Sequence, residues 1–148
     1  MRYLIAFLAA VGLVVSVLAL RVHYSNEVQS CDINAHWDCG VVNHSRYAEV
    51  QGIPVAALGI LGYGALILLG LTRRVRLVAL GALIGLGFAV YLSYVEADVL
   101  QVWCLYCVIS QITIALLFTV SIVEMIRSGG FVRRGARHGA DGGPGRHA

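Results

Sequence analysis

Charged residues are scarce in this chain of 148 residues. They make up 13% of the sequence, against about 25% in ordinary soluble domains, and hydrophobic residues make up 59%. Lysine is absent: all eleven basic residues are arginine, which indicates a compositional habit rather than a mechanism. This composition excludes a water-soluble globular fold and indicates an integral membrane protein.

The sequence also lacks a basic face interleaved with aromatic residues. Its arginines flank apolar runs instead, so nucleic-acid binding is not expected. The alternation of apolar and polar residues that indicates strands is absent from the long apolar runs. Because only helices and closed barrels satisfy backbone hydrogen bonds in lipid, each run is interpreted as a helix.

Four uncharged runs are long enough to cross a bilayer, which requires about 20 residues. They cover residues 3–20, 53–71, 77–95 and 99–123, with the fourth span placed at 102–123. The apolar core of the first run is too long for a signal peptide, and no Ala-x-Ala cleavage site follows it. We therefore expect an all-α membrane protein with one domain, a bundle of four transmembrane helices over residues 1–126.

The placement of arginines predicts the orientation of the bundle. With a cytoplasmic N-terminus, only Arg21 and Arg46 lie outside, and nine arginines lie inside, as the positive-inside rule requires. The inner arginines are Arg2, Arg73, Arg74, Arg76, Arg127, Arg133, Arg134, Arg137 and Arg146. Six of the eight acidic residues fall on the outer side: Glu27, Asp32, Asp38, Glu49, Glu96 and Asp98. We expect a multi-pass protein of the cell membrane with both termini in the cytoplasm.

The polar segments between and after the spans carry weaker patterns. The outer loop 22–52 contains a short helical pattern that Asn43, His44 or Ser45 would cap and Gly52 would end, so we expect it to cover the bundle. Glu96 and Asp98 end the third span, where we expect them to mark the boundary with water. Residues 127–148 are rich in Gly and Arg without apolar periodicity, which predicts a disordered cytoplasmic tail.

The four cysteines all fall on the predicted outer side. Cys31 and Cys39 lie in the outer loop, and Cys104 and Cys107 open the fourth span. An extracytoplasmic compartment is one in which disulfides persist. Two thiols spaced as Cys-x-x-Cys share one face of a helix, and the N-terminus of that helix favours the reactive thiolate.

Three interpretations of these cysteines stay open on spacing alone. Two pairs on one side suggest a relay of mixed disulfides between a soluble thiol protein and an acceptor in the bilayer. Both pairs could instead be structural disulfides. The four thiols, or some of them with His36 or His44, could bind zinc, although the seven-residue gap of the loop pair and an oxidising compartment argue against a metal.

Several motifs occur together in this chain. The loop has Cys-x7-Cys followed six residues later by Ser, Gly-Ile-Pro-Val opens the second span, and Trp-Cys-x-Tyr-Cys opens the last. With four helices, this combination resembles the vitamin K epoxide reductase family over residues 1–126. The resemblance is to bacterial members, which reoxidise an extracytoplasmic thioredoxin-fold (DsbA-like) protein and pass the electrons to a membrane quinone. We expect a menaquinone, ubiquinone or phylloquinone-type quinone, and a separate partner protein because no thioredoxin-like domain is fused here.

The resemblance also implies a role for each cysteine. Cys31 exchanges with the thiols of the partner, Cys39 passes electrons to Cys104, and Cys107 faces the quinone. The implied chemistry is that of a thiol:quinone oxidoreductase that supports disulfide bond formation without a metal. The alternatives are a reductase that recycles a quinone or its epoxide, and a non-enzymatic membrane protein stapled by disulfides.

The quinone-binding residues implied by the resemblance are Ser45, Val55, Gly59, Tyr106 and Gln111. Vertebrate members carry an Asn at the position of Val55 and a Tyr at that of Gln111, and both bind the quinone by hydrogen bonds. Val55 cannot donate one, whereas Gln111 could, and the loss of the Asn favours quinone reduction over epoxide reduction in the vertebrate manner. Ser45 could equally cap the loop helix. The outer aromatic residues could line a slot for a planar ligand or form an interfacial belt: Tyr91, Tyr94, Trp103 and Tyr106.

Overall fold

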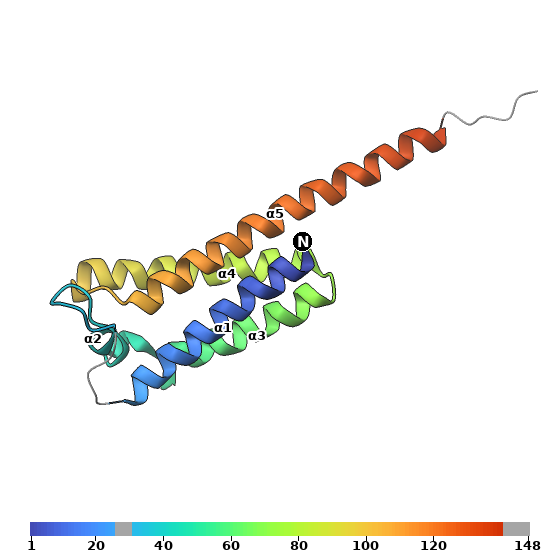
Figure 1. Cartoon of the computed structure of the whole chain (residues 1–148). Coiled ribbons are helices and arrows are strands. Elements are labelled where there is room, and N and C mark those ends of the chain that lie inside the picture. The colour runs from blue at the N-terminus through green and yellow to red at the C-terminus, as the bar shows by residue number, and fades with distance from the viewer. Residues whose placement is uncertain (26–30, 141–148) are drawn as a thin grey trace, which may run out of the picture.

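Four long helices form an antiparallel bundle in the computed structural model, which describes residues 1–25 and 31–140. The helices are α1 (Arg2–Tyr24), α3 (Val55–Leu71), α4 (Val75–Tyr94) and α5 (Leu105–Ala140). Residues 31–54, between α1 and α3, fold over the bundle end that lies opposite the N-terminus (Figure 1). The predicted all-α bundle of four helices is confirmed.

The surface of the bundle is apolar along its length. Three segments are long and apolar enough to cross a bilayer, Arg2–Tyr24, Val75–Leu100 and Leu105–Ser128, and Val55–Leu71 is a shorter apolar helix of 17 residues. Large hydrophobic side chains point outward, among them Leu61 at 71% exposed and Ile84 at 67%. A soluble bundle would bury such side chains against other helices, whereas lipid covers them in a membrane protein.

Small residues let the helices approach closely in the core. Ala9 in α1 and Ala82 in α4 are fully buried. The ring of Tyr63 in α3 lies against Gly12 in α1, where an added Cβ would come within 2.2 Å of the ring. Close packing of this kind is what holds membrane helices together, because lipid supplies no hydrophobic driving force between them.

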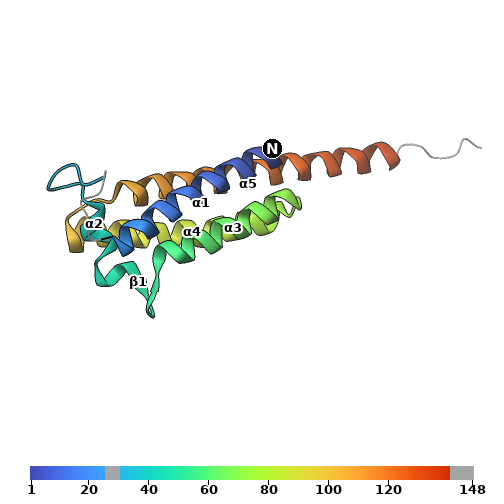
Figure 2. The same cartoon turned by 60° about the horizontal axis from the view of Figure 1, so that its bottom comes forward.

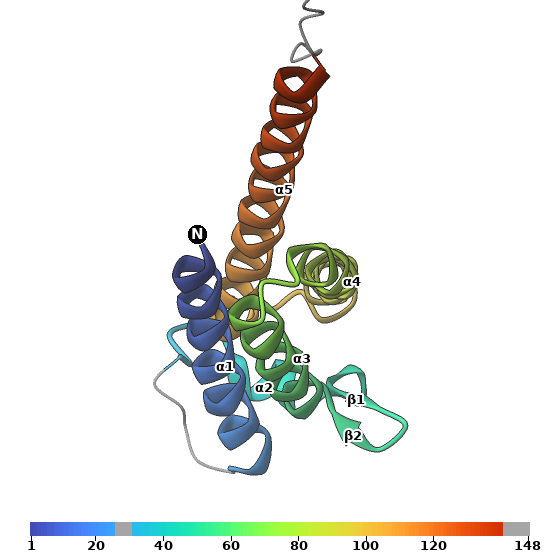
Figure 3. The same cartoon turned by 90° about the vertical axis from the view of Figure 1, so that its right-hand side faces the viewer.

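The loop forms a cap of short elements. Its helix α2 (Cys39–Asn43) is capped by the preceding residue, Asp38. The Oδ1 atom of Asp38 accepts a hydrogen bond of 2.9 Å from the Val41 amide. A 3₁₀ turn η1 (Arg46–Ala48) follows with Ser45 as its N-cap residue. The antiparallel strands β1 (Glu49–Val50) and β2 (Ile53–Pro54) then form a hairpin beside α3 (Figure 3).

The helix predicted near Ser45 to Gly52 is therefore reduced to one 3₁₀ turn. Gln51 and Gly52 both have positive φ, 53° and 81°, as a two-residue hairpin turn requires. This turn reverses the chain before a longer helix can form. The sequence also did not separate α2, whose five residues are too few to show a helical period.

The third span ends in a π-helical segment, η2 (Val95–Leu100), rather than at Val95. The wider π turn changes the direction of the side chains around the helix axis relative to an α-helix. Asp98 is exposed, whereas Glu96 is only 2% exposed. The expectation that Glu96 marks the water boundary is therefore wrong, because the π turn places its side chain inside.

Helix α5 extends far past the other helices at the N-terminal end of the bundle (Figures 1 and 2). The sequence predicts disorder from residue 127, but the structure continues as a helix to Ala140. Loss of apolar periodicity does not end a helix by itself, and arginine is a good helix former. The rest of the predicted tail, 141–148, lies outside the described residues.

Candidate active site

The cysteine loop is joined to the start of α5 by two backbone hydrogen bonds. The Asp38 amide donates to the Trp103 carbonyl at 3.1 Å, and the Trp103 amide donates to the His36 carbonyl at 2.8 Å. Cys39 follows Asp38 and Cys104 follows Trp103, so this pairing brings the two cysteines into one buried cluster. Both are 0% exposed.

The two cysteine pairs differ in their bonding. Cys31 and Cys39 form a disulfide with their Cα atoms 5.8 Å apart, whereas Cys104 and Cys107 are free thiols. A bonded loop pair offers no thiolates to a zinc ion, which argues against the four-cysteine zinc site. Cys31 is only 2% exposed, so the disulfide is shielded from other proteins in this arrangement of the loop.

Asn43, the last residue of α2, lies beside both pairs. Its side-chain amide Nδ2 donates to the Cys39 carbonyl at 2.9 Å and to the Sγ of Cys104 at 3.6 Å. A hydrogen-bond donor next to a sulfur stabilises its thiolate form. The sequence had suggested Asn43 only as a helix cap, because nothing in the pattern indicates that α2 points it at Cys104.

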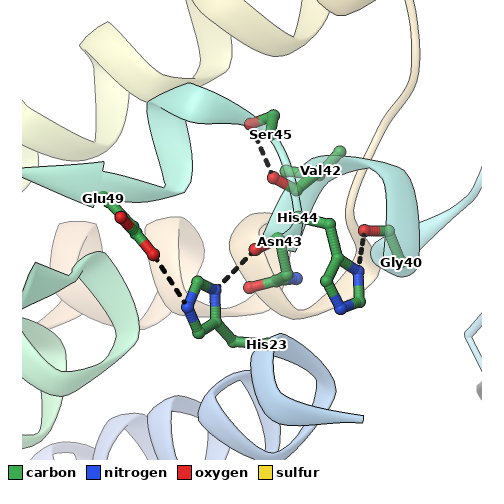
Figure 4. Close-up of polar contacts among 7 residues, drawn as sticks. All are labelled: His23, Gly40, Val42, Asn43, His44, Ser45 and Glu49. Carbon is green, nitrogen blue, oxygen red and sulfur yellow. Dashed lines mark hydrogen bonds and ion pairs between the residues drawn. The ribbon is translucent and has the colours of Figure 1, made fainter. Parts of the chain in front are cut away.

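His23 connects the end of α1 to this cap (Figure 4). Its Nδ1 lies 2.6 Å from the Asn43 carbonyl oxygen, and its Nε2 lies 3.3 Å from Glu49 Oε1. His44 turns away and places its Nδ1 2.8 Å from the Gly40 carbonyl. The sequence assigned no role to His23; the structure shows it supporting the backbone of the residue that contacts Cys104.

The free pair is electrostatically unequal. A hydrogen bond from the Cys107 side chain lowers the pKa of the Cys104 thiol, against the opposing effects of burial and of the Glu96 charge. Backbone groups of Tyr106 and Cys107 in the first turn of α5 act in the same direction. Cys104 therefore ionises more readily than a cysteine with the ordinary thiol pKa. A thiol with a lowered pKa is also a better leaving group in disulfide exchange.

An apolar cavity of about 450 Å³ lies beside Cys107, between the cap and the four helices. This volume lies within the range of about 300–1,000 Å³ that small-molecule sites occupy. Of the five residues that the resemblance assigned to quinone binding, four line the cavity: Ser45, Val55, Gly59 and Tyr106. Cys107 forms part of the same wall.

The fifth residue, Gln111, does not line the cavity. Its side-chain oxygen accepts a hydrogen bond from the Ser93 hydroxyl group of α4, which links two membrane helices. Tyr63 lines the cavity instead, and its hydroxyl group donates to the Ser110 carbonyl at 2.9 Å. Val55, Gly59 and Tyr63 are four residues apart on one face of α3, and this spacing is the signal that could have found Tyr63.

Two of the lining positions also have structural roles. A Cβ on Gly59 would lie 2.7 Å from Ser16 Oγ, so this glycine permits close packing of α3 on α1. The Ser45 hydroxyl donates to the Val42 carbonyl at 2.8 Å and ends α2. Ser45 therefore occupies both the N-cap position of η1 and the cavity wall, but its side chain makes no cap hydrogen bond to η1.

The outer aromatic residues divide between the two suggested roles. Tyr106 lines the cavity, as a slot for a planar ligand requires. Tyr91 and Tyr94 are 52% and 61% exposed on the outer surface, as in an interfacial belt. Trp103 is partly buried and holds the loop through its backbone.

The sequence matches the model of the vitamin K epoxide reductase family over residues 3–122. This range contains all four cysteines and every residue that lines the cavity. It also includes most of the four long helices. The match thus extends over the whole bundle and its site, and the chain is a membrane oxidoreductase that belongs to the vitamin K epoxide reductase family.

Proposed function

We propose that this protein is a membrane thiol:quinone oxidoreductase that reoxidises a separate thioredoxin-fold (DsbA-like) protein and so supports disulfide bond formation. One observation carries the proposal. The loop disulfide shares a buried cluster with Cys104, and the neighbouring Cys107 faces an apolar cavity of ligand size. This arrangement supports a path for electrons from the loop disulfide through Cys104 and Cys107 to the cavity.

The reaction begins at the loop. A thiolate of the reduced partner attacks Cys31, forms a mixed disulfide with it and releases Cys39 as a thiolate. The second thiol of the partner then attacks the mixed disulfide, so the partner leaves oxidised and Cys31 returns to the thiol. Because Cys31 is buried in the closed loop, docking of the partner has to be accompanied by movement of this segment.

The electrons next move to the helix pair. In the oxidised state of that pair, the Cys39 thiolate attacks Cys104 and releases Cys107 as a thiolate at the cavity wall. Cys31 then attacks Cys39, which restores the loop disulfide and leaves Cys104 and Cys107 as a dithiol that carries the two protons of the partner. The contact from Asn43 to Cys104 Sγ stabilises this leaving thiolate.

The cavity fits a quinone acceptor. Its wall is mostly apolar, and Ser45 and Tyr106 are among its few polar side chains. Val55 and Gly59 would contact a ring held there. A bound quinone supplies the two-electron, two-proton acceptor that returns Cys104 and Cys107 to a disulfide.

We further propose that the cysteine end is extracytoplasmic in the cell membrane, with the N-terminal end of α1 and the far end of α5 in the cytoplasm. Arg2 and Arg73 lie close together with Glu124 at the bundle end opposite the cysteines. The arginine-rich connection between α3 and α4 is therefore at the end that the positive-inside rule assigns to the cytoplasm.

Trapping of the Cys39–Cys104 intermediate tests the proposed path. The variant Cys31→Ala/Cys107→Ala retains only these two cysteines, and mild oxidation should join them, as detected by mass spectrometry of the linked peptides. The matched variant Cys31→Ala/Cys104→Ala retains Cys39 and Cys107, and its yield of the Cys39–Cys107 disulfide should be much lower. Equal yields from the two variants, or no bond in the first, would contradict the path.

Burial of the loop disulfide favours one alternative, a non-enzymatic staple. Cys31 and Cys39 are 2% and 0% exposed. A staple predicts that both sulfurs stay bonded when the protein meets a reduced thioredoxin-fold partner, whereas the relay predicts that they become transiently labelled by a thiol reagent. Recycling of a quinone epoxide is less well supported, because Val55 offers no donor to the cavity and Gln111 does not line it.

A further inference from the structure

Glu96 is an acidic side chain in an otherwise uncharged cavity. Among the described residues that line it, Glu96 is the only carboxyl group, and no Arg, Lys or His is present. The other ionisable side chains on the wall come from the cap, α3 and α5: Tyr47, Tyr63, Tyr106 and Cys107. Glu96 therefore has no cation to pair with in this site.

The two oxygens of this carboxyl group have different surroundings. Oε2 accepts a hydrogen bond of 3.0 Å from the Cys104 backbone amide. Oε1 is buried and has no hydrogen-bond partner within the described part of the chain. The group also lies close enough to the Cys107 thiol for the two to interact electrostatically. Glu96 thus bridges the backbone of one cysteine and the sulfur of the other.

A purely structural role accounts for only one of these oxygens. A carboxylate that binds an amide at the start of α5 acts as a helix cap, and a neutral side chain could accept the same bond. Burial of a carboxyl oxygen without a partner costs roughly 1–3 kcal/mol or more. A cap therefore leaves Oε1 unexplained, and the carboxyl group as a whole lies on the cavity wall and interacts with the Cys107 thiol. Buried carboxyl groups in such positions often exchange protons.

We propose that Glu96 carries protons between the Cys104–Cys107 dithiol and the cavity. The proposal rests on the function proposed above. When the dithiol becomes a disulfide, its sulfurs lose two electrons and two protons, and the quinone gains both. The Glu96 carboxylate takes the proton of Cys107 and delivers it to the cavity. Once ionised again, Glu96 carries the proton of Cys104, which reaches it through the contact between the two sulfurs.

Infrared difference spectroscopy tests the proposal without a quinone or a partner protein. The Cys104–Cys107 pair is reduced chemically in a Cys31→Ala/Cys39→Ala background, and spectra recorded during the reaction are compared with the spectrum before it. Because reduction runs the proton transfer in reverse, we expect a transient band of a protonated carboxyl group. Glu96→Gln should abolish this band. Asp98→Asn, which removes an exposed carboxylate from the same π-helical segment, should leave it intact.

Turnover measurements give a second readout in the otherwise unaltered protein. Glu96→Gln retains an acceptor for the Cys104 amide but cannot exchange protons, so turnover should fall by about 10²-fold or more. Glu96→Asp should retain more activity than Glu96→Gln, and Asp98→Asn should be unchanged. A structural cap predicts instead that Glu96→Gln turns over normally.

Two outcomes would overturn the role of Glu96: an unchanged rate in Glu96→Gln, or absence of the infrared band in the protein with Glu96 present. The second measurement needs no substitution at position 96, so it decides the question even if Glu96→Gln does not fold. Failure of the proposed function is distinguishable, because Cys107→Ala would then retain full activity.

Discussion

The side-chain amide of Asn43 lies 3.6 Å from the Sγ of Cys104, although the two residues are 61 positions apart in the chain. The contact joins the water-facing cap to the thiol that opens α5. Its partner on the other side is His23, which holds the Asn43 carbonyl from the end of α1. Three segments that are distant in the sequence therefore converge on one sulfur.

Replacement of Asn43 by Leu should slow the transfer of electrons from the loop to the helix pair. Leu has a similar volume but cannot donate to the Cys104 thiolate, and a hydrogen bond to a charged group contributes about 1.5–3 kcal/mol. We expect the exchange rate to fall about 10- to 100-fold, since 1.4 kcal/mol corresponds to a factor of ten. Rapid-quench alkylation measures this rate. Val41→Ala, an exposed change on the same helix, is the control and should not alter it.

The pKa of Cys104 should depend on a hydrogen-bond donor at position 107. In a Cys31→Ala/Cys39→Ala background, Cys107→Ser and Cys107→Ala both leave Cys104 as the single thiol. A seryl hydroxyl group can still donate to the thiolate, whereas alanine cannot, so the Ala variant should ionise at higher pH. Titration of the thiolate absorbance gives both midpoints. Equal midpoints, or a lower one in the Ala variant, would be inconsistent with the lowered pKa of Cys104.

Gly12→Ala should destabilise the bundle. The added Cβ would come within 2.2 Å of the Tyr63 ring, and overpacking of this kind costs roughly 1–3 kcal/mol. Gly64→Ala meets nothing within 4 Å and should be neutral or stabilising, by up to about 1 kcal/mol, because alanine favours a helix. Denaturant unfolding in detergent micelles compares the two. Equal stability of both variants would mean that α1 and α3 do not pack as described.

Removal of His23 should loosen the cap more than removal of its acidic partner. His23→Ala loses the contact with the Asn43 carbonyl in a partly buried site. Glu49 is 47% exposed, and exposed ion pairs contribute only about 0–1 kcal/mol, so Glu49→Gln should have little effect. The rate at which a small dithiol reduces the Cys31–Cys39 disulfide reports opening of the loop. Faster reduction is expected for His23→Ala alone, and an equal increase in both variants would argue against this role of His23.

Much of the fold follows from composition, because a membrane helix is recognised by the length of its apolar run. The runs around 53–71 and 77–95 correspond closely to α3 and α4. The four cysteines were also identifiable, since their spacing and position at span ends are local features. What the sequence did not reveal depends on geometry beyond one element.

Glu96 and Gln111 illustrate this limit. Glu96 resembles any acid at the end of a span until the π-helical turn places it inside. Gln111 is one helical turn after Cys107, but Ser93 from another helix binds it away from the cavity. The contact from Asn43 to Cys104 likewise depends on the backbone hydrogen bonds that join the loop to Trp103. These relationships arise from tertiary packing, which no local pattern encodes.

The most direct test of the relay is the quinone-dependent oxidation of a reduced thioredoxin-fold partner by the purified protein in lipid or detergent. With all four cysteines present, one quinol should form for each disulfide made in the partner. Cys107→Ala leaves the loop disulfide intact but removes the thiol at the cavity, so both products should be lost. Partner oxidation at the normal rate in Cys107→Ala with added quinone would contradict the account.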